Sequence, residues 1–234
     1  IGAANFLEEV DAGSRSYFAF ADPDQDGDQD CLVGTGSGHI QVFVNGGSSM
    51  VPAFAENASL AIVFAAGYGA NATPEWVDMN GDGDFDFILG EDGGQFEFFQ
   101  NVYNFGCGSY NAQIGASNPL NNMSGVTLNS SSATFCDVDG DGDQDAIVGS
   151  LNLGLFYFEN TGNPESPAFT YVGGSLDAAS PFFGMSFGQT TMPTVADIDR
   201  DGDCDIFVGR ADGTIDYLRN DGGGSFTMMN AAAA

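Results

Sequence analysis

Aspartates stand at alternate positions in four short stretches of the chain, and this spacing suits a hard divalent cation. The stretches are ADPDQDGDQDCLVG (21–34), VDMNGDGDFDFILG (77–90), CDVDGDGDQDAIVG (136–149) and ADIDRDGDCDIFVG (196–209). Their shared pattern is D-x-[DN]-x-D-G-D-x-D, followed by an apolar triplet and a glycine. Because so many like charges in one loop repel one another, a cation is needed to complete each stretch. Ca²⁺ takes about six to eight oxygen ligands, which alternating side chains of a tightly turned loop can supply.

Loop positions 1, 3, 5 and 9 are the predicted side-chain ligands of the ion. Position 7 is expected to give its backbone carbonyl, while its carboxylate faces outward or holds a bound water. The glycine at position 6 permits the sharp turn that aims the chain back at the ion. The predicted metal-binding residues are Asp22, Asp24, Asp26, Asp28, Asp30, Asp78, Asn80, Asp82, Asp84, Asp86, Asp137, Asp139, Asp141, Asp143, Asp145, Asp197, Asp199, Asp201, Asp203 and Asp205. The sequence thus predicts four Ca²⁺ sites, and the neutral Asn80 makes the second the weakest.

An EF-hand begins with the same spacing, so it has to be considered. It requires a glutamate at position 12 and flanking helices. Position 12 is apolar in all four loops, and the flanking residues have the pattern of strands; the four residues are Val33, Leu89, Val148 and Val208. An EF-hand is therefore excluded. A single loop of this kind could be an ordinary Asp/Gly turn. Four copies with the predicted ligands at the same positions argue against that interpretation.

The loops belong to a fourfold repeat with a period of roughly 58 residues. In every copy the glycine after the apolar triplet is followed, at a constant distance, by an asparagine that ends a short alternating strand: Asn45, Asn101, Asn160 and Asn220. Each unit has about four short strands and no helical period, which is typical of a propeller blade. We therefore expect an all-β fold, a β-propeller built from four blades. The single domain spans 1–234, with blades at about 11–58, 66–105, 126–173 and 186–230, and Gly/Asn/Ser-rich insertions at 106–132 and 174–192.

The acidic loop, the [LI]-V-G triplet, the Gly turn and the F-x-N-x-G ending together resemble the FG-GAP/VCBS repeat of integrin α-chain propellers and secreted microbial proteins. The resemblance implies a calcium-bearing blade in an exported protein that serves adhesion, ligand recognition or architecture. An FG element is visible at Phe187–Gly188, but blades one and three lack a clear GAP element. Integrin propellers have more than four blades, so both a compact four-bladed ring and part of a larger assembly stay open. Residues 1–10 could close such a ring by pairing with 224–230.

The four cysteines are Cys31, Cys107, Cys136 and Cys204. None forms a C-x-x-C pair and His39 is the single histidine, so the sequence offers no Cys/His zinc site. Buried thiols and disulfides both remain open from composition. In a closed ring, Cys31 would lie beside Cys204 and Cys107 would join Cys136.

The chain is strongly acidic, with a net charge of −29 and only four Lys plus Arg against 33 Asp plus Glu. Nucleic acid and anionic membranes are excluded as partners because their phosphates would be repelled. No apolar run approaches the roughly 20 residues that span a bilayer. The chain starts at Ile1 and ends in NAAAA, so we expect a processed piece of a longer, extracellular protein. Four glycosylation sequons begin at Asn57, Asn71, Asn122 and Asn129.

No nucleophile motif is present, and His39 in a GSGHI turn is a poor candidate for a general base. We therefore expect a non-enzymatic extracellular module that binds calcium and acts in surface architecture or adhesion, with other protein subunits or cell-surface glycans as partners. Self-assembly into a homo-oligomer, filament or layer is one form of that role. The alternatives are a lectin that uses aromatics such as Tyr68, Tyr110 or Phe183, and an accessory domain of a secreted hydrolase. Trp76 is expected in the core.

Overall fold

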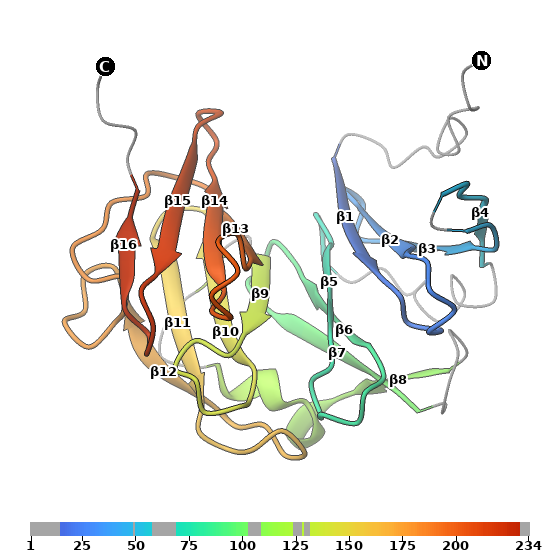
Figure 1. Cartoon of the computed structure of the whole chain (residues 1–234), viewed down its shortest axis with the longest axis horizontal. Helices are drawn as coiled ribbons and strands as arrows, with labels where there is room; N and C mark the ends of the chain where they lie inside the picture. Colours follow the sequence, from blue (N-terminus) through green and yellow to red (C-terminus); the bar gives the residue numbers. More distant parts are fainter. Residues whose placement is uncertain are drawn as a thin grey trace. The chain divides into compact units, whose positions relative to one another are not determined.

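The chain forms sixteen β-strands and two short 3-10 helices within the residues that the structure describes (Figure 1). This computed structural model describes residues 15–48, 50–57, 69–102, 109–123, 128 and 132–229. The strands are divided between two compact units. Unit 1 comprises residues 1–78, 82–92 and 96–114, and unit 2 comprises 79–81, 93–95 and 115–234.

Unit 1 contains two four-stranded antiparallel sheets, and in each one every strand pairs with the next in sequence. The first sheet is blade 1 and the second is blade 2. Blade 1 consists of β1 (Ser16–Ala21), β2 (Asp30–Thr35), β3 (Ile40–Asn45) and β4 (Phe54–Glu56). Blade 2 consists of β5 (Thr73–Val77), β6 (Asp86–Gly90), β7 (Phe96–Asn101) and β8 (Tyr110–Gln113).

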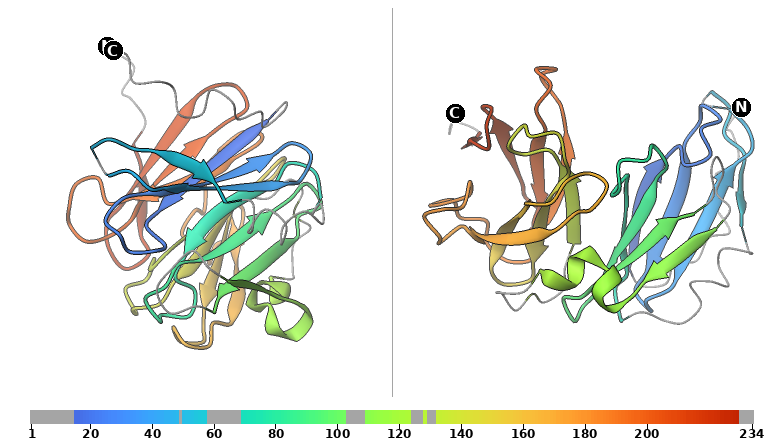
Figure 2. Two further views of the ribbon diagram at one scale, coloured as in Figure 1. Left: turned by 90° about the vertical axis from the view of Figure 1, so that its right-hand side faces the viewer. Right: turned by 90° about the horizontal axis from the view of Figure 1, so that it is seen from below.

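Unit 2 repeats this arrangement with blades 3 and 4, again as simple antiparallel meanders (Figure 2). Blade 3 consists of β9 (Ser132–Cys136), β10 (Asp145–Ser150), β11 (Gly154–Asn160) and β12 (Phe169–Gly174). Blade 4 consists of β13 (Met192–Ala196), β14 (Asp205–Gly209), β15 (Ile215–Asn220) and β16 (Phe226–Met228). The 3-10 helices η1 (Gly115–Ser117) and η2 (Pro119–Asn122) precede blade 3. Four blades of this kind confirm the predicted all-β, β-propeller fold class.

The repeated glycine after the apolar triplet has a packing role within each unit. A Cβ on Gly34 would lie 2.0 Å from the carbonyl oxygen of Ala72 and 2.6 Å from Cδ of Pro74, at the entry to blade 2. In unit 2 a Cβ on Gly149 would meet the carbonyl oxygen of Thr191 at 2.1 Å and Cδ of Pro193 at 2.6 Å. Only glycine leaves room for the first strand of the next blade to approach this closely. The glycine and the proline of that strand are therefore in contact.

Each unit has its own apolar core between its two blades. In unit 1 the rings of Phe87 and Phe99 stack with centroids 4.5 Å apart, and Trp76 meets Phe87 edge-on at 5.8 Å. Trp76 is only 9% exposed, which confirms its predicted place in the core. Tyr110, one of the aromatics suggested for sugar stacking, is buried in the same core and is not available to a ligand.

The predicted insertion at 106–132 is partly a strand. β8, the fourth strand of blade 2, lies inside it and pairs with β7. Its sequence, YNAQ, lacks the alternating apolar pattern, because only Tyr110 of this edge strand faces the core. The proposed ring-closing residues 1–10 lie outside the described residues, as does Tyr68. Within the described residues, no helix has the length and apolar character needed to cross a membrane.

Candidate metal centres

The four acidic loops connect the first and second strands of the four blades, and we number them 1 to 4 in chain order. The first aspartate organises each loop. In loop 1, Oδ1 of Asp22 accepts a 3.1 Å hydrogen bond from the backbone N–H of Asp26, and Oδ2 accepts one of 3.0 Å from Gly27. Asp78 and Asp137 bind the corresponding N–H groups of loops 2 and 3. The loop therefore coils around the carboxylate at position 1.

Two loop positions adopt left-handed backbone angles. The position-6 glycines have φ between 89° and 98° in all four loops, which confirms their predicted turn role: Gly27, Gly83, Gly142 and Gly202. Position 4 is also left-handed in every loop, at Gln25 (φ 58°), Gly81 (68°), Gly140 (83°) and Arg200 (64°). The sequence did not reveal this second turn, because two of the four residues are not glycine.

The coiling brings predicted ligand side chains together. Carboxylate oxygens of Asp22, Asp24 and Asp26 lie within 4.8 Å of one another in loop 1. The same holds in loop 3 for positions 1, 3 and 9, which are Asp137, Asp139 and Asp145. It also holds in loop 4 for positions 1, 3 and 5, which are Asp197, Asp199 and Asp201. Oxygens at this separation can share one hard cation. Loop 2 has the same backbone bonds around Asp78 and carries Asn80 at position 3.

The carboxylate at position 9 has a second role that the sequence did not reveal. It is buried in every blade and accepts a hydrogen bond from the backbone N–H of the asparagine that ends the third strand. The four bonds are Asn45 to Asp30 (2.7 Å), Asn101 to Asp86 (2.7 Å), Asn160 to Asp145 (2.8 Å) and Asn220 to Asp205 (2.9 Å). The repeated Asp and Asn are thus partners, and this bond ties the end of each acidic loop to the body of its blade.

The carboxylate at position 7 is expected from the sequence to face outward or to hold a bound water, and in loops 1 and 3 it does not face outward. Asp28 and Asp143 are only 6% and 5% exposed, and Oδ1 of each is buried without a hydrogen-bond partner among the described residues. Burial, together with the neighbouring loop aspartates, raises the pKa of Asp28 and raises that of Asp143 to about 6. An unpaired buried carboxylate oxygen is costly. A cation in the loop would relieve this cost, so the donor set fits Ca²⁺.

A disulfide links two of the loops. It joins Cys136, directly before loop 3, to Cys204 at position 8 of loop 4. The predicted pairings of Cys31 with Cys204 and of Cys107 with Cys136 are therefore wrong. They assumed neighbours across a closed ring, whereas the first strands of blades 3 and 4, β9 and β13, lie side by side within unit 2. Cys31 is a free, buried thiol, and Cys107 lies outside the described residues.

Two of the four predicted sequons can be assessed. Asn57 is half-buried after β4. Asn71 has a left-handed backbone (φ 58°), and its side-chain amide donates a hydrogen bond to Oδ2 of Asp92. The side chain of Asn122 and the whole of Asn129 lie outside the described residues. A glycan on Asn71 would leave this amide a single N–H, so the bond to Asp92 would have to use that remaining hydrogen.

Comparison with known proteins agrees with the repeat. The model of a family described as "FG-GAP-like repeat" matches residues 22–89, a stretch that runs from the first aspartate of loop 1 to the triplet after loop 2. No curated protein matches the chain. Among solved structures, the chain is similar to an Agrocybe aegerita lectin described as recognising non-reducing terminal N-acetylglucosamine. The TM-score is 0.51 at 20% identity, over 91% of this chain and 51% of the lectin chain. The chain thus spans about half of that lectin, and the likeness is one of fold.

Proposed function

We propose that this chain, in which residues 22–89 form an FG-GAP-like repeat, is an extracellular module that binds four Ca²⁺ ions and has no enzymatic activity. Its role is in adhesion or surface architecture. The calcium proposal rests on the carboxylates of Asp28 and Asp143. In each, a buried oxygen lacks a hydrogen-bond partner among the described residues, and other carboxylates of the same loop lie close to it.

An extracellular location is supported by two features. FG-GAP repeats are common in exported proteins, and the disulfide Cys136–Cys204 is of a kind that persists in oxidising surroundings. Self-assembly, N-glycosylation and attachment to a secreted hydrolase stay predictions.

Calcium dependence of the melting temperature tests the proposal. Metal-free protein, prepared by dialysis against a chelator, should melt at a clearly lower temperature, and Ca²⁺ should restore the original value. A ligand at a hundred times its Kd adds about 2.7 kcal/mol per site to the free energy of unfolding. Mg²⁺ at equal concentration should restore less, because it retains its waters and demands octahedral geometry. An unchanged melting temperature across these conditions would refute the calcium proposal.

A loop variant and a matched control make the test specific. Asp139→Asn removes one predicted ligand charge from loop 3, whereas Glu56→Gln removes one charge from the exposed outer strand of blade 1. Only the first should lower the number or affinity of bound Ca²⁺ in calorimetry. Equal effects of both variants would indicate diffuse attraction to an acidic surface instead of defined sites.

Glycan binding is a second candidate function. It is favoured by a pocket in unit 2 with apolar and polar walls, and by the fold shared with a lectin. A glycan array with the calcium-loaded protein tests it: saturable binding to one class of sugar supports a lectin, and the absence of binding across the array counts against it.

A further inference from the structure

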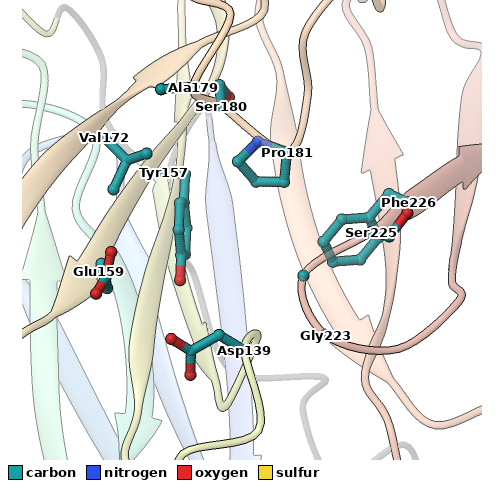
Figure 3. Close-up of a pocket in the computed structure, with 11 residues that line it drawn as sticks. Asp139, Tyr157, Glu159, Val172, Ala179, Ser180, Pro181, Gly223, Ser225 and Phe226 are labelled. Carbon is teal, nitrogen blue, oxygen red and sulfur yellow. The ribbon is translucent and has the colours of Figure 1, made fainter.

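A pocket of about 420 Å³ lies within unit 2, beside loop 3 (Figure 3). Strands β11 and β12 of blade 3 supply Tyr157, Glu159 and Val172. Across from them, the turn before β16 of blade 4 supplies Gly223 and Ser225, and β16 itself supplies Phe226. The segment 179–181 completes the lining together with Asp139 of loop 3. A volume of this size is within the range of small-ligand sites, which run from about 300 to 1,000 Å³.

Apolar side chains provide walls for a ring-shaped ligand. Val172 and Pro181 line the pocket, as does Phe226, whose ring packs against Phe182 at a centroid distance of 5.7 Å. Because Phe226 belongs to the buried core, its position is fixed. Hydroxyl groups of Ser180 and Ser225 stand among these walls. A site that combines rigid apolar surface with a few polar groups suits a ligand having both C–H faces and hydroxyls.

The charge of the pocket is negative. Its ionisable lining groups other than tyrosine are the carboxylates of Asp139 and Glu159, and no arginine lines it. Glu159 lies close enough to contribute to the raised pKa values of Asp143 and Tyr157. Ca²⁺ in loop 3 would offset only two of the five aspartate charges of that loop, so the potential at Glu159 stays negative with the ion bound. A cationic ligand is therefore favoured and an anionic one repelled.

We propose that this pocket binds an amino sugar with a free, protonated amine, its ammonium group paired with Glu159 and its ring against Phe226. The inference rests on the second candidate function, glycan binding, and adds the position of the site and the chemical class of the sugar. A lysine side chain would also satisfy Glu159, but it is too thin to fill the volume and brings no hydroxyls to Ser180 and Ser225.

Paired sugars give a direct test in titration calorimetry. Oligomers of glucosamine should bind the calcium-loaded protein at least tenfold more tightly than oligomers of N-acetylglucosamine, because acetylation removes the charge. Glu159→Gln should weaken glucosamine binding about tenfold, while Glu165→Gln, which has the same net charge, should leave it unchanged. Equal binding of both sugars, or equal weakening by both variants, would overturn the proposal.

A blocking variant locates the site. Gly223 has φ of 59°, which asparagine tolerates, and a Cβ there meets no atom within 4 Å. Gly223→Asn should therefore fold, with an unchanged melting temperature, and abolish glucosamine binding. Retained binding in this variant would overturn the proposed location. If N-acetylated sugars bind and Gly223→Asn abolishes that binding, the amine assignment is wrong while glycan binding stands. If no sugar on the glycan array binds, both fail.

Discussion

The phenolic hydroxyl of Tyr157 donates a 2.8 Å hydrogen bond to Oδ2 of Asp145, the residue that closes loop 3. Loop 4 repeats the arrangement, since Tyr217 donates to Oδ2 of Asp205 at the same distance. In both loops, Oδ2 of the closing aspartate thus accepts a hydrogen bond from the tyrosine, and Oδ1 accepts one from the backbone N–H of the asparagine that ends the third strand.

Blades 1 and 2 lack this tyrosine. The residues at the same place, three before the asparagine, are Val42 and Phe98. The four loops are therefore not equivalent in the group that supports position 9. They fall into two pairs: loops 3 and 4 have the tyrosine, and loops 1 and 2 do not.

Tyr157→Phe should destabilise the protein and weaken the third calcium site. The variant loses a buried hydrogen bond to a charged group, which costs about 1–3 kcal/mol. The pKa of Asp145 should then rise above its value of about 6, because the bond from Tyr157 lowers it. Since Ca²⁺ needs the ionised carboxylate, the loss of calcium affinity in calorimetry should be larger at pH 6 than at pH 8.

Tyr171→Phe is the matched control for that variant. Tyr171 also donates to a carboxylate, Oδ2 of Asp177, but lies outside the acidic loops. It should change calcium affinity at neither pH. A pH-independent effect of Tyr157→Phe on calcium binding would contradict the role given to its hydroxyl.

The stability of the metal-free protein should increase as the pH falls from 7 to about 5. Burial raises the pKa values of Asp143 and Asp145 to about 6, above the ordinary value of 3.8. The folded state therefore holds protons that the unfolded chain has released, and this stabilisation is lost as the pH rises through 6. Thermal melts across this range, after removal of metal by dialysis, measure the effect.

Excess Ca²⁺ should reverse this pH trend. The bound ion requires ionised carboxylates, so acidification then removes the stabilising ligand. Melting curves that follow the same pH trend with and without Ca²⁺ would contradict the assignment of these aspartates to the metal sites.

Reduction of the disulfide should lower stability and affect loops 3 and 4 together. The bond Cys136–Cys204 closes a loop with a sequence separation of 68, for which chain entropy predicts about 4 kcal/mol. Peptide mapping of the unreduced protein should find this pair linked and Cys31 as a free thiol. Melting curves with and without reductant measure the loss; unaltered calcium affinity of both loops after reduction would show that the bond is only a structural link.

Asn80→Asp should strengthen calcium binding at loop 2. It restores the charge that the other three loops carry at position 3, and affinity rises with the number of charged ligands. Stepwise titration should show the weakest site of the unmodified chain move toward the others. Asn152→Asp, in the exposed turn between β10 and β11 of blade 3, adds the same charge away from the acidic loops and should leave the weakest site in place.

The fold was largely predictable because the repeat marks the same points in every blade. The spacing of Asp, Gly and Asn located the acidic loops and the first three of the four strands in each blade. The fourth strand of blade 2 was not recognisable, since YNAQ buries a single tyrosine and its remaining residues face outward. The ligand positions within each loop could be predicted because they depend only on local spacing. The disulfide depends on which blades lie next to each other, and local spacing does not show this.

The partnership between Asp30 and Asn45, repeated in the other three blades, lies wholly inside one blade. The side chain of the asparagine then accepts from the backbone of the turn that follows, at Gly47 and Ala53. A duplication or loss of one complete repeat in the gene would therefore carry every one of these bonds with it. Selection can vary the number of repeats while the interior of each stays unchanged, and sequence drift should concentrate in the connecting segments.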